Sequence, residues 1–112
     1  MLTVYGIKQC DTCRKALKWL QRQGVDHRFH DLRVDGLDAA QVRGWLDSDF
    51  ADQLVNRRST TWRGLSEAEK ASEGDDLVAL LVEHPTLVKR PVFETGAVIA
   101  VGFKPDTLAP LL

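Results

Sequence analysis

The sequence predicts an α/β domain in which a mixed β-sheet is flanked by helices. A short apolar run near the N-terminus leads directly into a segment with helical spacing, and a second strand-like run follows. The middle of the chain carries several helical patterns, and two further strand-like runs meet at a turn signal. This order predicts a βαβ unit, a helical insertion and a β-hairpin.

Composition restricts the class of protein. The chain has 112 residues and 44% hydrophobic residues, which fits one small domain with a modest core. Its 15 basic and 16 acidic residues balance, so we expect no nucleic-acid or membrane binding. There is no apolar run of roughly 20 residues and no signal-peptide pattern. The chain has only two cysteines, which favours a reducing compartment, so we expect a cytoplasmic protein. We also expect a monomer.

The N-terminal part shows strand, helix and strand patterns. "LTVYGI" is β-rich and predicts a buried strand. Asp11 or Thr12 is suited to be the N-cap of a helix that ends near Gly24. "VDHRFHDLRV" alternates and predicts a second strand, parallel to the first by the right-handed crossover rule. The apolar positions of the helix are three, four and seven residues apart: Cys13, Ala16, Leu17 and Leu20.

The middle of the chain, roughly residues 37–84, is predicted to be a helical insertion. "LDAAQVRGWLD" and "SEAEKAS" both begin with capping-box pairs. "FADQLVN" predicts a short helix, and "DDLVALLVEH" predicts a helix that Pro85 ends. The basic segment "NRRSTTWRG" is predicted to be a loop. The two capping-box pairs are Asp38 with Gln41 and Ser66 with Glu69.

The C-terminal part predicts a hairpin and a helix. "PVFET" and "AVIAVGF" are strand-like and meet at Thr95-Gly96, and "KPDTLAPLL" predicts a helix with Pro105 near its start. Together the elements describe a single domain over residues 1–112 with a thioredoxin-type fold, in which the hairpin adds antiparallel strands to the sheet.

Both cysteines lie at the predicted start of the first helix. Positions i and i+3 share one helix face, about 5–6 Å apart at Cβ, so Cys10 and Cys13 are able to pair. Cys10 precedes the helix, where unpaired N–H groups and the helix dipole favour a thiolate, with Lys8 and Arg14 nearby. Cys10 is therefore the candidate nucleophile. Cys13 is expected to be more buried, either as a resolving thiol or as an inert core residue.

A metal site is not expected. A single CxxC supplies two of the four ligands that structural zinc takes, and none of the three histidines, His27, His30 and His84, has a partner at ligand spacing.

Three stretches of the chain carry a family resemblance: "YGIKQCDTCRKALKWL", "LVNRRSTTWRGL" and "LLVEHPTLVKRPVF". In this order they resemble the arsenate reductase (ArsC) family, most closely its YffB-like branch, which neighbours the Spx-type transcription regulators. The resemblance implies a thioredoxin-like fold with Cys10 as the catalytic cysteine. It also implies a cis bond between Arg90 and Pro91, with Arg90 facing the Cys10 thiolate.

These implied roles agree with the chemistry of the residue types. A guanidinium beside Cys10 lowers the pKa of the Cys10 thiol and can bind a carboxylate or oxyanion through two hydrogen bonds. The backbone before a cis-Pro can pair with an extended thiol ligand such as glutathione. From the dipeptide alone, Arg90 could equally be an ordinary surface arginine. The expected substrate-binding residues are Lys8, Arg57, Arg58, Pro91 and Lys104.

Two departures from the family pattern affect the expected substrate. Arsenate reductases of the family bring three arginines to the oxyanion. Here the mid-chain position falls at Asn56, Arg57 or Arg58, and the C-terminal position is Lys104, which lacks a planar fork. Those enzymes also commonly use one cysteine here with an external thiol, whereas this chain has Cys13 in addition.

Three functions are therefore expected from the sequence. The leading one is a thiol oxidoreductase that binds no resident cofactor, uses glutathione as co-substrate or glutaredoxin as partner, and reduces the disulfide or oxidised form of a small-molecule or protein thiol substrate. The second is a glutaredoxin-coupled arsenate reductase. The third is a redox-sensing regulator like the Spx-type proteins, which use a CxxC switch while binding RNA polymerase.

Overall fold

The computed structural model describes residues 1–104, 106 and 108, and its centre is a four-stranded sheet of order β2-β1-β3-β4. β1 (Leu2–Gly6) pairs in parallel with β2 (His27–Asp31) and antiparallel with β3 (Val92–Thr95). β4 (Ala97–Val101) pairs antiparallel with β3 across Gly96, whose φ of 75° suits a tight turn. The predicted mixed sheet is confirmed.

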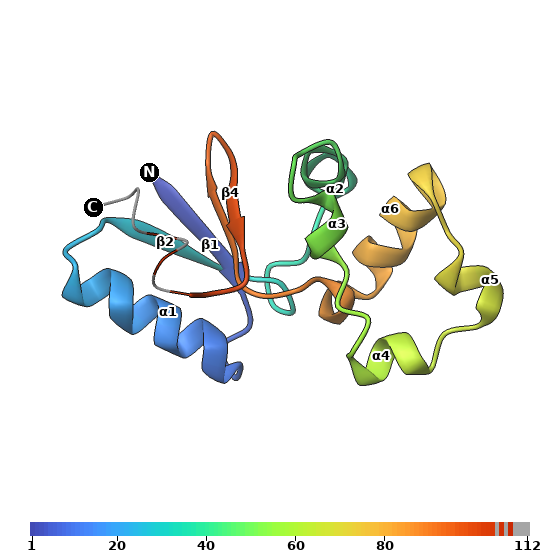
Figure 1. Cartoon of the computed structure of the whole chain (residues 1–112), viewed down its shortest axis with the longest axis horizontal. Coiled ribbons are helices and arrows are strands. Elements are labelled where there is room, and N and C mark those ends of the chain that lie inside the picture. Colours follow the sequence, from blue (N-terminus) through green and yellow to red (C-terminus); the bar gives the residue numbers. More distant parts are fainter. Residues whose placement is uncertain (105, 107, 109–112) are drawn as a thin grey trace.

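Helix α1 (Asp11–Arg22) covers one face of this sheet (Figure 1). It connects β1 to β2 and makes the parallel crossover that the sequence predicts. The buried residues of α1 follow the helical spacing. Ala16 and Leu20 of this helix pack with residues of β1, β3 and β4 in a first core cluster, whose members are Leu2, Val4, Ala16, Leu20, Phe93, Ala100 and Leu108. This packing fixes the start of α1 relative to the end of β1.

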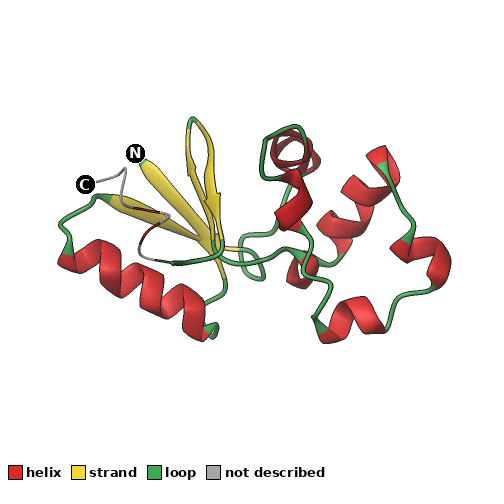
Figure 2. Cartoon of the chain, viewed as in Figure 1, coloured by secondary structure: helices red, strands yellow, loops and turns green. Residues whose placement is uncertain are grey.

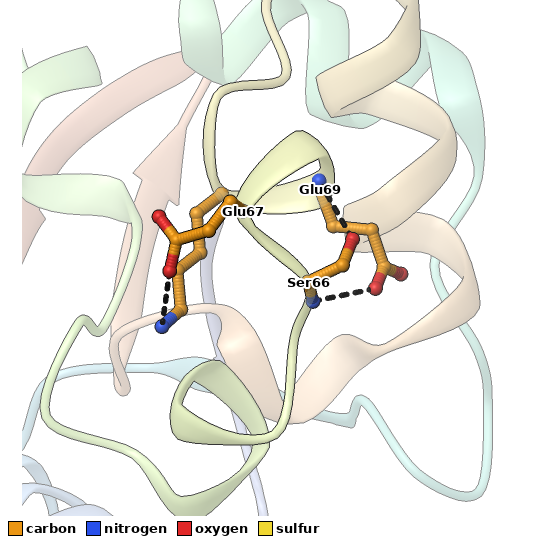
Figure 3. A network of polar contacts seen from close by, with 4 residues as sticks. Ser66, Glu67 and Glu69 are labelled. Atoms are coloured by element: carbon orange, nitrogen blue, oxygen red, sulfur yellow. Dashed lines mark hydrogen bonds and ion pairs between the residues drawn. The ribbon is translucent and has the colours of Figure 1, made fainter.

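The insertion between β2 and β3 is helical (Figure 2). It contains α2 (Ala39–Leu46), α3 (Ala51–Leu54), α4 (Thr60–Arg63), α5 (Glu67–Lys70), α6 (Gly74–Glu83) and a 3-10 turn at Pro85–Leu87. Both predicted capping boxes are present. Figure 3 shows the one at α5, where Ser66 Oγ accepts from the Glu69 N–H at 3.1 Å and Glu69 Oε1 accepts from the Ser66 N–H at 2.9 Å.

The insertion packs on the face of the sheet opposite α1. Its core cluster joins insertion residues such as Trp45 and Leu81 to Tyr5 of β1 and Val92 of β3. Alternation along β1 explains this division, since Val4 points to the α1 side and Tyr5 points to the insertion side. The domain is elongated, with extents of 44 × 25 × 25 Å.

Two polar connections attach the insertion to the sheet. Val55 and Val88 form an isolated antiparallel bridge. Two hydrogen bonds of 2.7 Å flank it: the Asn56 N–H donates to the Leu87 carbonyl, and the Lys89 N–H donates to the Leu54 carbonyl. Separately, the Glu94 carboxylate accepts from the Tyr5 hydroxyl at 3.1 Å and from the Trp45 indole N–H at 2.9 Å.

Some sequence predictions need correction. The N-cap of α1 is Cys10, because its carbonyl accepts from the Arg14 N–H and its own backbone is extended, so neither Asp11 nor Thr12 takes that position. The "NRRSTTWRG" segment contains the short helix α4, which Ser59 caps by accepting from the Trp62 N–H. The predicted C-terminal helix over 104–112 lies largely outside the described residues. None of the described helices has the length and apolarity to span a bilayer.

Replacing Glu94 with Ala is expected to destabilise the domain. The Tyr5 hydroxyl and the Trp45 N–H would lose their shared acceptor in a partly buried position, at a cost of about 1–3 kcal/mol in the free energy of unfolding. Urea denaturation measures this cost, with the exposed Glu73→Ala as a matched control expected to change little. If Glu94→Ala and Glu73→Ala had the same free energy of unfolding, the contacts of Glu94 with Tyr5 and Trp45 would contribute nothing to stability.

Candidate active site

The loop between β1 and α1 is held in place by Asp31, a buried carboxylate at the end of β2. Asp31 Oδ2 accepts from the Lys8 N–H at 3.2 Å, and Oδ1 accepts from the N–H groups of Arg33 and Val34. Burial raises the pKa of Asp31, but these N–H groups and the Lys8 charge outweigh it and hold the pKa low. The ionised carboxylate therefore fixes the backbone that leads into Cys10.

Cys10 lies at the N-terminal end of α1. Its backbone N–H donates to the Ile7 carbonyl at 3.0 Å, and its φ and ψ of −86° and 122° place it as the N-cap. Its side chain is partly buried. The first turn of a helix leaves N–H groups unpaired, and these favour a negative charge at this point.

The pKa of Cys10 is lowered by its surroundings. Burial raises the pKa, but hydrogen bonds to the sulfur from the Cys13 backbone N–H, the Cys13 thiol and the Arg90 guanidinium act against burial and outweigh it. The positive charge of Arg90 adds to this effect. The structure therefore supports the prediction, made from the helix position, that Cys10 is the more acidic thiol of the pair.

Cys13 is in the opposite situation. It is fully buried, and burial, with the charge of Cys10 adding to it, raises its pKa to about 12 although the Ile7 N–H acts to lower it. Its sulfur packs against Gly6, where an added Cβ would come within 2.6 Å of Sγ. Both thiols are free. At neutral pH Cys13 is therefore a protonated thiol that donates to Cys10.

Arg90 reaches the cysteines from the segment before β3. The Arg90–Pro91 peptide bond is cis, which confirms the expectation. The guanidinium Nη1 donates to the carbonyls of Thr86 at 3.0 Å and Val88 at 3.3 Å, which hold the group in place. Nε is buried and has no hydrogen-bond partner among the described atoms. Arg90 thus brings a fixed positive charge to Cys10.

Cys10 opens into a cleft of about 430 Å³ between α1, the insertion and the end of β4. This volume lies within the range of about 300–1,000 Å³ that is usual for small-molecule sites. The charged side chains that line it are all cationic: Lys89, Arg90 and Lys104. The remaining lining residues are Thr12, Gln53, Asn56, Val101, Gly102 and Phe103. The cleft therefore favours an anionic ligand beside the Cys10 sulfur.

The other expected binding residues are distributed unevenly. Lys104 lines the cleft, and Pro91 lies beneath it, where its carbonyl accepts from the Gly102 N–H at 2.8 Å. Arg57 and Arg58 are exposed and do not line the cleft, and the Arg57 guanidinium lies over the Trp62 ring at 5.5 Å. Of the three mid-chain alternatives, Asn56 is the one at the cleft.

Lys8 and Arg14 also lie away from the cleft. Lys8 is exposed and lines two other surface depressions, and its carbonyl accepts from Arg14 Nε at 2.9 Å. Arg14 in turn faces Asp11 at 3.6 Å. The main charge beside the Cys10 sulfur therefore comes from Arg90, 80 positions later in the chain, and neither nearby basic residue is among the main causes of the lowered Cys10 pKa.

Sequence reasoning missed several lining residues. Gln53, which the sequence did not single out, reaches the cleft together with Asn56, one of the three mid-chain alternatives, because the bridge between Val55 and Val88 folds the insertion against the segment before β3. Lys89 stands in the quoted "HPTLVKRP" stretch, which is the only signal that could have singled it out. Within the described residues, no cluster of three or more His, Cys, Asp or Glu side chains has metal-ligand geometry.

Replacing Gly6 with Ala is expected to destabilise the domain by about 1–3 kcal/mol, because the new methyl group would overlap the Cys13 sulfur. The cost should fall in a Cys13→Ala background, where that sulfur is gone. Urea denaturation of the single and double variants measures the coupling. Gly44→Ala on α2 is the control, because its Cβ would meet nothing within 4 Å. An equal cost in both backgrounds would contradict the Gly6–Cys13 contact.

Comparison with known proteins agrees with this geometry. A protein of Haemophilus influenzae described as uncharacterized is 47% identical over 110 residues, covering 92% of this chain and 91% of that protein. The global transcriptional regulator Spx of Enterococcus faecalis is 27% identical over 114 residues, covering 100% of this chain and 86% of the relative. A solved structure described as a YFFB protein has a TM-score of 0.90 and 39% identity. It covers 100% of this chain and 99% of that one.

The family assignment rests on nearly the whole chain. The sequence model of the ArsC family matches residues 5–110, which include the end of β1, both cysteines, the insertion and the β3–β4 hairpin. The mixed sheet with its flanking helices is the thioredoxin-like fold that the structural neighbours share. The chain belongs to the ArsC family.

Proposed function

We propose that this chain is a cytoplasmic thiol-disulfide reductase in which Cys10 is the nucleophile and glutathione or glutaredoxin supplies the reducing thiol. The observation that carries the proposal is the placement of Cys10 at the start of α1, where Arg90 and the Cys13 N–H lower its pKa and a cationic cleft opens beside it. A thiolate is the reactive form in disulfide exchange, and these contacts keep it populated at neutral pH.

In the first step the Cys10 thiolate attacks one sulfur of a substrate disulfide. A new bond forms between that sulfur and Cys10 Sγ, the substrate S–S bond breaks, and the second substrate sulfur leaves as a thiolate that takes a proton from solvent. Two electrons pass from Cys10 to the substrate pair. Arg90, held by the Thr86 and Val88 carbonyls, stabilises the thiolate before attack.

In the second step another thiolate attacks the mixed disulfide on Cys10. The S–S bond at Cys10 breaks, Cys10 leaves as the thiolate, and the attacking thiol becomes part of a new disulfide. Free glutathione can enter through the cleft, whereas Cys13 is fully buried against Gly6 and its pKa is raised to about 12. We therefore propose that an external thiol resolves the intermediate and that Cys13 mainly holds Cys10.

A second candidate is arsenate reduction through a Cys10–arsenic ester, and family membership favours it. The cationic lining of the cleft also fits an oxyanion. However, the mid-chain position at the cleft is Asn56 and the C-terminal one is Lys104, and neither side chain offers the planar bidentate fork of arginine. Disulfide reduction, which needs only the thiolate, is the better supported reaction.

A third candidate is redox-sensing regulation, which the similarity to Spx over the full length of this chain favours. Such a switch requires a Cys10–Cys13 disulfide as its oxidised state. The spacing of the two residues across one helical turn permits that bond. The regulator would then be recognised by co-purification with RNA polymerase and by the absence of turnover.

The direct test is turnover of a mixed disulfide between cysteine and glutathione, in the presence of glutathione, glutathione reductase and NADPH. We expect wild type to consume NADPH, Cys10→Ser to lose this activity by at least about 100-fold, and Cys13→Ala to keep most of it because glutathione resolves the intermediate. A parallel assay replaces the mixed disulfide with arsenate and adds glutaredoxin.

Each outcome separates the candidates. Arsenate turnover that exceeds disulfide turnover would establish the arsenate reductase and overturn our choice of substrate. A Cys13→Ala variant as inactive as Cys10→Ser would make Cys13 the resolving thiol. If wild type turned over neither substrate, the reductase proposal would fail and the regulator would be the remaining account.

A further inference from the structure

We propose that Lys89 is the residue that selects the thiol co-substrate, by binding a carboxylate of an anionic thiol in the cleft beside Cys10. This inference rests on the proposed reductase function and adds a specificity-determining position to it. It separates two tasks that the sequence analysis assigned to Arg90, namely stabilising the thiolate and holding an anionic part of the substrate.

Arg90 is already committed to protein atoms. Its Nη1 donates to the carbonyls of Thr86 and Val88, and the guanidinium also donates to the Cys10 sulfur. The remaining Nε has no partner among the described atoms but is buried, so the guanidinium has few donors left at the cleft for a bidentate carboxylate contact. A carboxylate in the same cleft therefore needs a different cation.

Lys89 is positioned for this role by two contacts. Its backbone N–H donates to the Leu54 carbonyl at 2.7 Å, which fixes the residue between the insertion and the sheet. Its side chain lies over Gly102, where an added Cβ would come within 3.2 Å of Lys89 Cε and 3.7 Å of Nζ. Gly102 has a φ of 78° and no side chain, so its surface leaves room for the lysine at the cleft.

The charges around Lys89 define the ligand class. Cys10 and Lys89 line the same cleft, and among the described residues that line it there is no Asp or Glu. Over residues 1–104, 106 and 108, no ion pair engages the Lys89 ammonium group. A thiol that carries a carboxylate can therefore place its sulfur at Cys10 and its charge at Lys89, whereas a neutral thiol gains nothing from Lys89.

The test compares two thiols in the same turnover assay: glutathione, which carries carboxylates, and 2-mercaptoethanol, which is neutral. Disulfide consumption is followed directly in both cases. We expect Lys89→Gln to raise the KM for glutathione about two- to five-fold, as for a partly exposed charge pair, with kcat and the 2-mercaptoethanol rate unchanged. Lys89→Arg, which keeps the charge, should restore most of the affinity. Lys18→Gln, an exposed lysine of α1 outside the cleft, is the matched control.

A second measurement does not depend on turnover. Iodoacetate and iodoacetamide both alkylate a cysteine thiolate and are similar in size, but iodoacetate carries a carboxylate where iodoacetamide carries a neutral amide. Lys89→Gln should lower the ratio of the iodoacetate rate to the iodoacetamide rate at low salt, while Lys18→Gln leaves the ratio unchanged.

The outcomes distinguish this inference from the reductase function. If the enzyme turns over both thiols but Lys89→Gln changes neither the glutathione KM nor the alkylation ratio, the Lys89 role is wrong and the reductase stands. If Lys89→Gln slows both thiols equally, Lys89 acts on the site as a whole and does not select a carboxylate. If no thiol supports turnover but the ratio falls, the reductase fails and the anion site at Lys89 remains.

Discussion

The site depends on stabilising one negative charge, the Cys10 thiolate, at a point where two separate parts of the chain meet. The start of α1 supplies the Cys13 N–H, and the segment before β3 supplies the Arg90 guanidinium. Neither part can be placed without the packing around it. The first core cluster sets α1 on the sheet, and the carbonyls of Thr86 and Val88 hold the guanidinium. Burial alone would raise the pKa of Cys10, so these contacts decide its state.

The helical insertion contributes by holding the Arg90 segment. The bridge between Val55 and Val88 lies two residues before Arg90 and joins the insertion to this segment. The same bridge brings Asn56 and Gln53 to the cleft and fixes the backbone of Lys89. The Glu94 contacts to Tyr5 and Trp45 attach α2 to the sheet on the same side. The insertion thus forms one wall of the cleft and also supports the cation opposite Cys10.

Sequence patterns predicted the parts of the molecule that local rules determine. The helix spacing after Cys10, the two capping boxes and the Gly96 turn depend on residues within a few positions of one another. They also showed that Cys10 and Cys13 flank a helix start. The cis bond at Pro91 and the approach of Arg90 came from the family resemblance, because a dipeptide does not determine either.

The residues that sequence reasoning misplaced or missed depend on tertiary contacts. Arg57 looked like a binding residue, but it lies over Trp62 on the surface, while its neighbour Asn56 faces the cleft. Asp31 and Lys89 gave no local signal, because their roles arise from the loop before Cys10 and from the strand end at Gly102. Lys8, which Asp31 holds, and Gly102, which Lys89 covers, are 23 and 13 positions away from these residues, which is beyond what periodicity detects.

The central claim is that the two cysteines differ in acidity: hydrogen bonds from Cys13 and Arg90 lower the pKa of Cys10 despite its burial, and burial raises the pKa of Cys13. The most direct measurement is a pH titration of the cysteine ¹³Cβ shifts by NMR in wild type and in Arg90→Gln. We expect the Cys10 midpoint to lie below the ~8.5 of an ordinary thiol and to rise in Arg90→Gln. We expect Cys13 to remain protonated at pH values above ~8.5. A Cys10 midpoint at or above the ordinary value, or one that Arg90→Gln leaves unchanged, would contradict this account of the site.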